Sequence, residues 1–195
     1  MKSYKYLIIG NSAAGIAAAE GIREVDKSGS LAIVSDEPVQ TYSRALIAFY
    51  LMGQVSRERL SYRRPDFYEK NGIEAILGQR VEKIDFGRRR VQLSDGGELG
   101  YEQVLLATGG KPVRPPIPGI ELEGVYTFQS LGDAEAVGES LAGVSALEAQ
   151  PRPRVAEAQR RLRAVVVGGG LIGLQAAEAL AGLGLEVSVV ELMGR

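Results

Sequence analysis

The chain has 195 residues, of which 45% are hydrophobic and 24% charged, a composition that fits a soluble globular protein with room for one domain and part of another. Its formal net charge of −1, without a long basic run, argues against nucleic acid or an anionic membrane as the main partner. It contains no cysteine and no histidine, which excludes a thiol nucleophile, a redox disulfide, a zinc site and an imidazole base.

The N-terminal sequence does not resemble a targeting segment. Lys5 and Tyr6 lead directly into a short apolar run, whereas a signal peptide has a cationic region followed by a long apolar stretch. No apolar run reaches the length of a membrane span. We therefore expect a cytoplasmic protein with no membrane partner, no nucleic acid and no metal site.

The first glycine-rich stretch predicts a nucleotide-binding strand, turn and helix. The apolar run Leu7–Ile9 is typical of a strand buried on both faces of a parallel sheet, and a helix is expected from about Ser12 to about Glu24. Gly10, Ser12 and Gly15 occupy the three glycine positions of G-x-G-x-x-G, which allow a tight turn and close approach to a pyrophosphate. A serine in the middle position would crowd the phosphate if its backbone were left-handed. For this motif alone, a strand, turn and helix without a ligand is the alternative.

A second strand, Leu31–Val34, ends in two acidic residues, Asp36 and Glu37. An acidic residue about 20 positions after the glycine turn is suited to accept a hydrogen bond from a ribose 2′-hydroxyl. Both residues qualify and the sequence does not choose between them. The alternative is that both belong to a solvated turn.

The next two segments predict helices. Gln40–Leu51 carries aromatic and aliphatic anchors, while Arg57–Asn71 carries charges of both signs and ends in a C-cap signal at Gly72. Arg44 is the one charge within the first of these helices. It either reaches a phosphate or the edge of a cofactor, or extends to solvent, and the two alternatives stay open.

Short strands replace helices between residues 73 and 109. We expect them at Glu74–Leu77, Gln79–Asp85, Arg90–Ser94 and Glu98–Leu106. They predict a small antiparallel insertion in an α/β domain, with the chain back in the parallel sheet at Val104.

The segments that follow predict a connection. The proline-rich stretch Lys111–Gly119 predicts an extended crossing between domains, and Leu131–Leu147 predicts a weak helix. Pro151–Arg163 is basic and alanine-rich, and it predicts either a surface helix or a mobile linker.

The opening pattern then returns as a complete β-α-β unit. After the strand-like run Ala164–Val167, Gly168, Gly170 and Gly173 fill all three glycine positions, and Glu191 falls 23 positions after the first glycine at a strand end. This is a strong signal for a dinucleotide site. A carboxylate there would repel a 2′-phosphate, so the site should prefer NAD over NADP. Two such turns about 158 residues apart are not explained by one cofactor.

Four motifs together resemble the FAD-dependent pyridine nucleotide-disulfide oxidoreductase superfamily over essentially the whole chain. They are I-I-G-N-S-A-A-G, Y-S-R-A-L, L-L-A-T-G-G-K-P and V-V-V-G-G-G-L-I-G-L-Q-A-A-E. Within the superfamily, the chain is similar to the NADH-oxidising flavin portion of nitrite reductase large subunits and to rubredoxin and ferredoxin reductases. The resemblance implies an α/β fold: a Rossmann-like FAD-binding domain with an antiparallel β-meander insertion (1–112), a crossing and linker (113–163), and the first β-α-β half of a second Rossmann-like, NAD-binding domain (164–195).

The resemblance also implies which residues bind the cofactors. FAD would take the first turn, through Gly10, Ser12, Ala13, Ala14 and Gly15 at the pyrophosphate, Asp36 or Glu37 at the ribose, Arg44 near the cofactor, Val81 at the adenine, and the A-T-G turn of Ala107, Thr108 and Gly109. NADH would take Gly168, Gly170, Gly173 and Glu191.

The chain departs from the superfamily at the flavin. The disulfide-reducing branches carry a redox cysteine near residues 42 to 46, and its absence here excludes reduction of disulfides through a cysteine. Gln175 replaces a glutamate that many relatives pair with a lysine, and Ala48 and Phe49 stand near the position of that lysine. The chain lacks both charged residues of this pair, as expected, because either charge buried without its partner would be destabilising. No catalytic residue is predicted.

The resemblance implies hydride transfer from NADH to FAD and electron transfer onward to an acceptor protein or centre. A non-catalytic nucleotide-binding or redox-sensing module is the alternative. Relatives continue beyond the position of Arg195, so we expect an N-terminal fragment of a longer enzyme or a chain completed by a partner. Uncovered sheet edges and apolar helix faces would then favour association, as a homo-oligomer or with a missing C-terminal segment.

Overall fold

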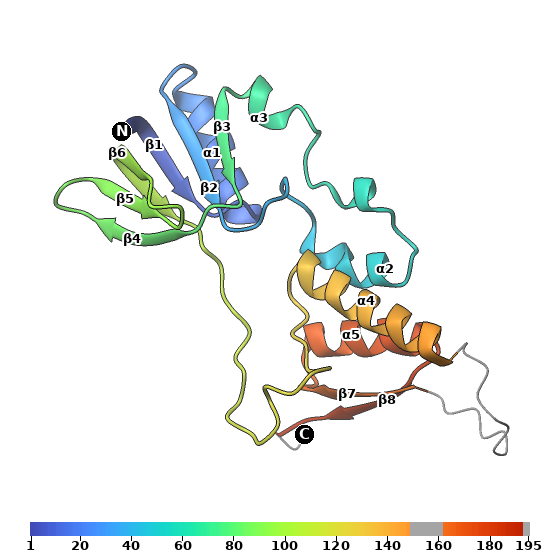
Figure 1. The fold of residues 1–195 in the computed structure, drawn as a ribbon. Coiled ribbons are helices and arrows are strands. Elements are labelled where there is room, and N and C mark those ends of the chain that lie inside the picture. Colours follow the sequence, from blue (N-terminus) through green and yellow to red (C-terminus); the bar gives the residue numbers. More distant parts are fainter. Residues whose placement is uncertain (149–161, 193–195) are drawn as a thin grey trace, which may run out of the picture. The chain divides into compact units, whose positions relative to one another are not determined.

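The computed structural model describes residues 1–148 and 162–192 (Figure 1). The chain separates into two compact units, Met1–Tyr42 with Ser61–Gly110, and Ser43–Leu60 with Lys111–Arg195. The predicted surface helix or linker over 151–163 lies outside the described residues, apart from its last two positions. The fold class expected from the sequence is confirmed, whereas the predicted domain boundaries stay a prediction.

The first unit is built on one mixed six-stranded sheet. Its strands, in chain order, are β1 (Lys2–Ile9), β2 (Leu31–Ser35), β3 (Ile73–Leu77), β4 (Val81–Asp85), β5 (Arg90–Leu93) and β6 (Glu98–Leu106). Their order across the sheet is β3-β2-β1-β6-β5-β4. The pairs β3-β2, β2-β1 and β1-β6 are parallel, and β6-β5 and β5-β4 are antiparallel.

Two expectations about these strands are wrong in detail. The strand at residues 74 to 77, expected in the antiparallel insertion, is β3, and it pairs in parallel with β2. The return to the parallel sheet, expected at Val104, comes earlier in the chain, since β6 pairs in parallel with β1 from Leu99 onward. Short apolar strands carry no signal for the direction of their neighbours, because direction depends on chain crossings far away in sequence.

The parallel strands are buried between two layers. On one face, α1 (Ala13–Val25) and α3 (Phe67–Lys70) pack on a core that includes Ile8 and Ile33 (Figure 1). On the other face, residues of β5 and β6 pack on Leu7, Ile9 and Val34. Burial on both faces explains why β1 and β2 have continuous apolar runs rather than alternating ones.

The two helices expected over Gln40–Leu51 and Arg57–Asn71 are wrong as continuous elements. The first is a 3₁₀ turn, η1 (Arg44–Leu46), followed by α2 (Ile47–Leu51), and the second breaks into η2 (Arg57–Leu60) and α3. Two features interrupt the second helix. Ser61 forms a β-bridge with Tyr42 and is therefore not helical, and Pro65 disfavours helical backbone at Arg64.

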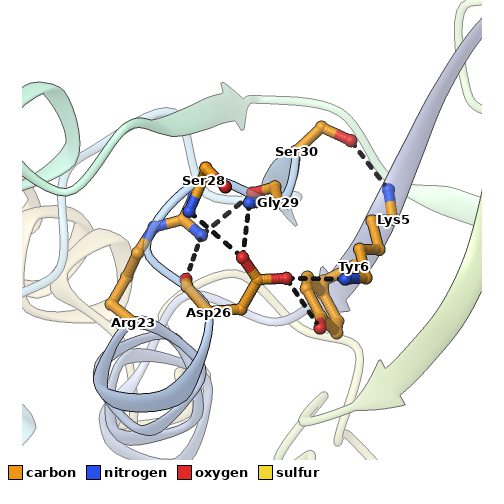
Figure 2. Close-up of polar contacts among 7 residues, drawn as sticks. All are labelled: Lys5, Tyr6, Arg23, Asp26, Ser28, Gly29 and Ser30. Atoms are coloured by element: carbon orange, nitrogen blue, oxygen red, sulfur yellow. Dashed lines mark hydrogen bonds and ion pairs between the residues drawn. The ribbon is translucent and has the colours of Figure 1, made fainter.

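Asp26 organises the loop that joins α1 to β2. One carboxylate oxygen accepts the N–H groups of Ser28 and Gly29 at 3.1 and 2.7 Å, and the other accepts from Lys5 Nζ at 2.7 Å and from the Tyr6 hydroxyl at 3.1 Å (Figure 2). These donors stabilise the charged form, so the pKa of the Asp26 carboxyl lies well below its usual range.

Arg23 holds the same loop from its other side. Its side chain is 9% exposed and donates to four backbone carbonyls: Asp26 at 3.0 Å, Gly29 at 2.9 Å, Asn71 at 2.6 Å and Gly72 at 3.0 Å (Figure 2 shows the first two). The rigid guanidinium fork thereby joins the C-terminal end of α1 to the chain that enters β3.

The second unit contains α2, α4 (Leu131–Glu148), β7 (Arg163–Val167), α5 (Leu171–Gly182) and β8 (Glu186–Val190). Strands β7 and β8 form a two-stranded parallel sheet, α5 packs on it, and α2 contacts both α4 and α5 (Figure 1). The strands are much less buried than those of the first unit: Val165 is 65% exposed and Val167 is 64% exposed.

None of the described helices combines the length and the apolar character that crossing a membrane requires. Within residues 1–148 and 162–192, no three histidine, cysteine or acidic residues come together in a way that could hold a metal ion.

Candidate nucleotide-binding turns

The first glycine turn joins β1 to α1 and leaves no room for side chains at its two outer positions. Gly10 has a φ of +121°, and a Cβ there would lie 2.0 Å from the carbonyl oxygen of Ala107. A Cβ at Gly15 would lie 2.0 Å from the carbonyl oxygen of Gly10. Glycine is therefore required at both positions, once by the neighbouring strand end and once by the close packing of the helix on its own turn.

Ser12 occupies the middle position in extended backbone, with φ −117° and ψ −163°. The crowding expected for a left-handed residue therefore does not arise. Ser12 is the N-cap of α1 through its carbonyl, which accepts from the N–H of Ile16 at 3.0 Å, while its hydroxyl makes no capping hydrogen bond to the helix. The first N–H groups of a helix have no partner within it, so those at Ala13, Ala14 and Gly15 are available for an anion.

The end of β6 lies directly beside this turn. The N–H of Ala107 donates to the carbonyl of Ile9 at 2.8 Å, and Ala107 is the residue whose carbonyl excludes a side chain at Gly10. Thr108 and Gly109 follow as exposed residues, with Gly109 at a φ of +67°. The structure thus brings together two of the predicted motifs, 97 residues apart in sequence.

The two candidate acids follow β2, next to the turn. The N–H of Gly10 donates to the carbonyl of Val34 at 2.8 Å, which places the turn beside the end of that strand. The carboxylate of Glu37 accepts from the Tyr42 hydroxyl at 2.6 Å, whereas Asp36 is exposed. Which of the two would meet a ribose stays open.

Val81 also lies near the end of β2. Just before it, Gly78 and Gln79 donate backbone hydrogen bonds to Glu37 and Ser35 at 3.2 and 2.9 Å. The Val81 side chain packs against the core cluster that contains Val34. The strand predicted to meet an adenine therefore begins beside the acids predicted to meet its ribose.

Arg44 belongs to the second unit. Its guanidinium donates to the carbonyl of Gln129 at 2.9 Å, so it is engaged within that unit. Ala48, one of the two residues near the expected lysine position, is 4% exposed, and Phe49 is 41% exposed. The role of Arg44 toward a cofactor stays a prediction.

The second glycine turn, between β7 and α5, has the same internal geometry. Gly168 has a φ of +110°, and a Cβ at Gly173 would lie 2.0 Å from the carbonyl oxygen of Gly168. Gly170 is the N-cap of α5, in extended backbone at φ −74° and ψ 177°. The carboxylate of Glu191, just after β8, accepts the N–H of Gly169 at 2.6 Å. The structure therefore brings all four residues of the predicted second site together.

Two residues at the first turn, Asn11 within it and Tyr68 beside it, were not among the predicted site residues. The Tyr68 hydroxyl donates to Asn11 Oδ1 at 2.7 Å, from 57 residues away in sequence. The only signal in the sequence was an asparagine inside the turn, and nothing there pointed to its partner.

The chain is similar to known proteins over nearly its whole length. A family model described as pyridine nucleotide-disulphide oxidoreductase matches residues 4–195. Rhodocoxin reductase of Rhodococcus erythropolis is 35% identical over 190 residues, which are 97% of this chain and 40% of that protein. The NAD(P)H nitrite reductase large subunit of Klebsiella oxytoca is 35% identical over 169 residues, 87% of this chain and 16% of that protein.

A similar fold is found among solved structures. The NAD-dependent persulfide reductase from A. fulgidus matches with a TM-score of 0.82 at 32% identity, over 97% of this chain and 34% of that one. The chain thus spans less than half the length of each of these relatives.

Proposed function

The chain belongs to the pyridine nucleotide-disulphide oxidoreductase family, whose members use FAD and NAD(P)H, and from this membership we propose that it is the cofactor-binding part of an FAD-dependent NADH oxidoreductase. FAD is assigned to the first glycine turn and NADH to the second. When bound, these cofactors would supply hydride transfer, and electrons would pass onward to an acceptor protein or centre. The protein contributes binding, orientation and electrostatics.

The observation that carries the proposal is the shape of the first turn. Gly10 and Gly15 leave a backbone cradle at the start of α1, where a Cβ at either position would overlap a carbonyl oxygen. The extended backbone of Ser12 keeps the middle of the turn out of the left-handed region, and no acidic residue stands in the first turn of α1. A pyrophosphate fits such a helix start through N–H donors and the positive end of the helix dipole.

The second turn supports the choice of NADH. Glu191 stands at the end of β8, within reach of the turn, since its carboxylate contacts the N–H of Gly169. A carboxylate there can accept hydrogen bonds from ribose hydroxyls and would repel a 2′-phosphate. We therefore assign NAD rather than NADP to this site.

The acceptor is proposed by chemical class only. Two of the relatives named above are a rhodocoxin reductase and a nitrite reductase subunit, and these names are consistent with a protein or a redox centre as the acceptor. The absence of cysteine from this chain leaves it without the thiol that transfer to a disulfide would use. No residue of the chain is assigned as a catalytic acid or base.

The rival function is a nucleotide-binding or redox-sensing module without turnover. An absorption spectrum of the purified chain, recorded without air before and after NADH, separates the two. A visible flavin band that bleaches with NADH, and more slowly with NADPH, supports the oxidoreductase. A flavin band that NADH does not bleach favours the sensing module. A colourless protein that cannot be reconstituted with FAD contradicts the assignment of FAD to this chain.

A further inference from the structure

A chain of buried and partly buried hydrogen bonds runs from the first glycine turn through α3 to the segment after β2. The N–H of Thr41 donates to the Tyr68 hydroxyl at 3.1 Å, and that hydroxyl donates to Asn11 Oδ1 at 2.7 Å. The other end of the same amide, Asn11 Nδ2, donates to the carbonyl of Val39 at 3.3 Å. We call Asn11, Tyr68 and Thr41 the turn network.

The direction of every bond in the turn network is fixed by its ends. A backbone N–H can only donate, so the Tyr68 hydroxyl accepts from Thr41 and uses its own proton toward Asn11. A backbone carbonyl can only accept, so the Asn11 amide must present its nitrogen to Val39 and its oxygen to Tyr68. The side chain of Asn11 therefore has one orientation that satisfies both partners.

Two of the three residues of the turn network are protected from water, and Asn11 is partly buried. Thr41 is 3% exposed and Tyr68 is 7% exposed, and the Tyr68 ring packs edge-on against Phe67 with ring centroids 5.4 Å apart. Hydrogen bonds in such surroundings are stronger than in water, and a buried group that loses its partner keeps the full cost of desolvation. The network is therefore stiff and broken only at a cost.

The network connects the two parts of the first site that would contact neighbouring groups of a nucleotide, its pyrophosphate and its ribose. Asn11 lies between Gly10 and Ser12 in the turn for the pyrophosphate, while Val39 and Thr41 follow the acids proposed for the ribose. We propose, resting on the function proposed above, that Asn11 and Tyr68 are positioning residues that hold the turn and the ribose-side segment at the spacing FAD requires. They act through the backbone and do not themselves touch the reacting atoms.

The second turn shows what happens without such a network. Gly169 stands at the position of Asn11 and has no side chain, and the acid of that site, Glu191, contacts the turn directly through the N–H of Gly169. The side-chain hydrogen bonds of Asn11 therefore have no counterpart at the equivalent position of the second turn, Gly169. The second turn serves as the internal control.

The test compares Tyr68→Phe with Tyr101→Phe. Tyr101 is a matched control, because it is 6% exposed in the same unit and its hydroxyl has no hydrogen-bond partner among the described residues. Dissociation constants for FAD and for NADH are measured at a temperature where both variants are folded. Tyr68→Phe removes both hydrogen bonds of the hydroxyl, and we expect it to weaken FAD binding by about tenfold or more and to leave NADH binding within about twofold. Tyr101→Phe should leave both constants unchanged.

Two outcomes of the binding test overturn the proposal. In one, the two variants bind FAD equally well. In the other, Tyr68→Phe weakens NADH and FAD binding alike, which indicates general destabilisation. The double variant Asn11→Ala with Tyr68→Phe sharpens the result, because two residues that act through one bond should lose less together than the product of their single losses.

Amide hydrogen exchange gives a readout that needs no cofactor. In Tyr68→Phe, and not in Tyr101→Phe, exchange should accelerate at Thr41 and at residues 10 to 12. Unchanged exchange in the turn overturns the proposal. If the wild-type chain binds no FAD yet Tyr68→Phe accelerates exchange in the turn, the proposed function fails in this chain while the network stands as the element that positions the turn.

Discussion

The two glycine turns have nearly the same backbone but different neighbours. The first glycine has a φ of +121° in one turn and +110° in the other, and a Cβ at the last glycine would meet the first glycine's carbonyl at 2.0 Å in both. Around Gly10, however, the end of β6 closes in, and a Cβ would overlap the carbonyl of Ala107. Around Gly168, no described atom other than those of its chain neighbours lies within 4 Å of such a Cβ.

The difference comes from the sheets. Strand β1 is flanked by β2 and β6, while β7 pairs with β8 alone among the described strands. Leu7 in β1 is accordingly 1% exposed, whereas Val167 in β7 is 64% exposed. The motif thus encodes the turn itself, and the surrounding strands determine how firmly the turn is held and how much apolar surface its strand buries.

The largest effect should come from adding one methyl group to the first glycine of each turn. Gly10→Ala must accommodate both an unfavourable φ and overlap with the Ala107 carbonyl, and we expect it to destabilise the first unit by roughly 3 to 5 kcal/mol. Gly168→Ala bears the φ strain alone, which should destabilise the second unit by roughly 1 to 3 kcal/mol. Hydrogen-exchange opening energies of β1 and β7 report the two units separately.

Gly15→Ala and Gly173→Ala provide the control for that comparison. Both meet the same carbonyl of their own turn at 2.0 Å, so their local cost should be similar. If Gly10→Ala and Gly168→Ala prove equally costly, the end of β6 does not constrain the first turn.

The same contrast explains how much of the fold could be predicted from the sequence. Both turns, their helices and their strands follow from local patterns, since a buried run such as Leu7–Ile9 and a glycine spacing need only a few neighbouring residues. The parallel pairing of β3 could not be predicted, because it depends on β2, more than 35 residues away. The interrupted helix at residues 57 to 71 depends on a bridge to Tyr42 that no helical pattern could indicate.

The candidate site divides in the same way. Glycines that a backbone needs are visible in the sequence, and so are acids at strand ends. Asn11 and Tyr68 could not be predicted, because their role depends on a tertiary contact between them. In the fold, the burial of Arg23 could not be predicted either, because a buried arginine in a helix resembles an exposed one in sequence. Ser12 posed a difficulty that only its extended backbone resolves.

The C-terminal ends of α1 and α5 also differ in their contacts. Arg23 joins the end of α1 to four carbonyls, while α5 ends in a local turn at Gly184, which has a φ of +91°. Arg23→Met removes a buried guanidinium that donates to four partly buried carbonyls, so we expect it to lower the unfolding free energy of the first unit by about 2 to 3 kcal/mol. Gly184→Ala should cost the second unit about 1 kcal/mol, through backbone strain alone.

Arg88→Met is the control for Arg23, because Arg88 is exposed and should lose little. The unfolding free energy of each unit in all three variants is measured by hydrogen exchange at increasing denaturant concentration. If Arg23→Met and Arg88→Met lower the unfolding free energy equally, water replaces the guanidinium as the donor to the four carbonyls.

Acid should affect the two units through different aspartates. Lys5 and the N–H groups of Gly29 and Ser28 hold the pKa of Asp26 well below its usual range. At Asp133 in the second unit, burial raises the pKa, but N–H donors from Gln129 and Ser130 outweigh burial and leave the pKa lowered. A lowered pKa in the folded state means that the unfolded chain binds more protons, so each carboxylate contributes stability above its unfolded pKa near 4 that is lost as the pH falls.

We therefore expect Asp26→Asn to make the stability of the first unit less dependent on pH between about pH 5 and pH 2. Asp133→Asn should do the same for the stability of the second unit. Unfolding midpoints measured at a series of pH values, with probes in each unit, test this. Each variant is the control for the other, and an effect of either on the opposite unit would contradict the assignment.

The smallest expected effect concerns the acids, where the two turns differ in what the carboxylate contacts. Glu37 accepts from a tyrosine hydroxyl, whereas Glu191 accepts the N–H of its own turn and is exposed. Glu191→Gln keeps an oxygen for that N–H and removes only the charge, so the turn should persist while repulsion of a 2′-phosphate falls. Because an exposed charge contributes at most about 1 kcal/mol, the preference for NADH over NADPH should narrow by up to about fivefold.

Dissociation constants for both nucleotides measure this preference, and Glu186→Gln, at an exposed residue at the opposite end of β8, is the control. If both variants keep the wild-type ratio of the NADPH and NADH dissociation constants, the charge of Glu191 does not determine the preference for NADH. The shape of the turn would then determine it.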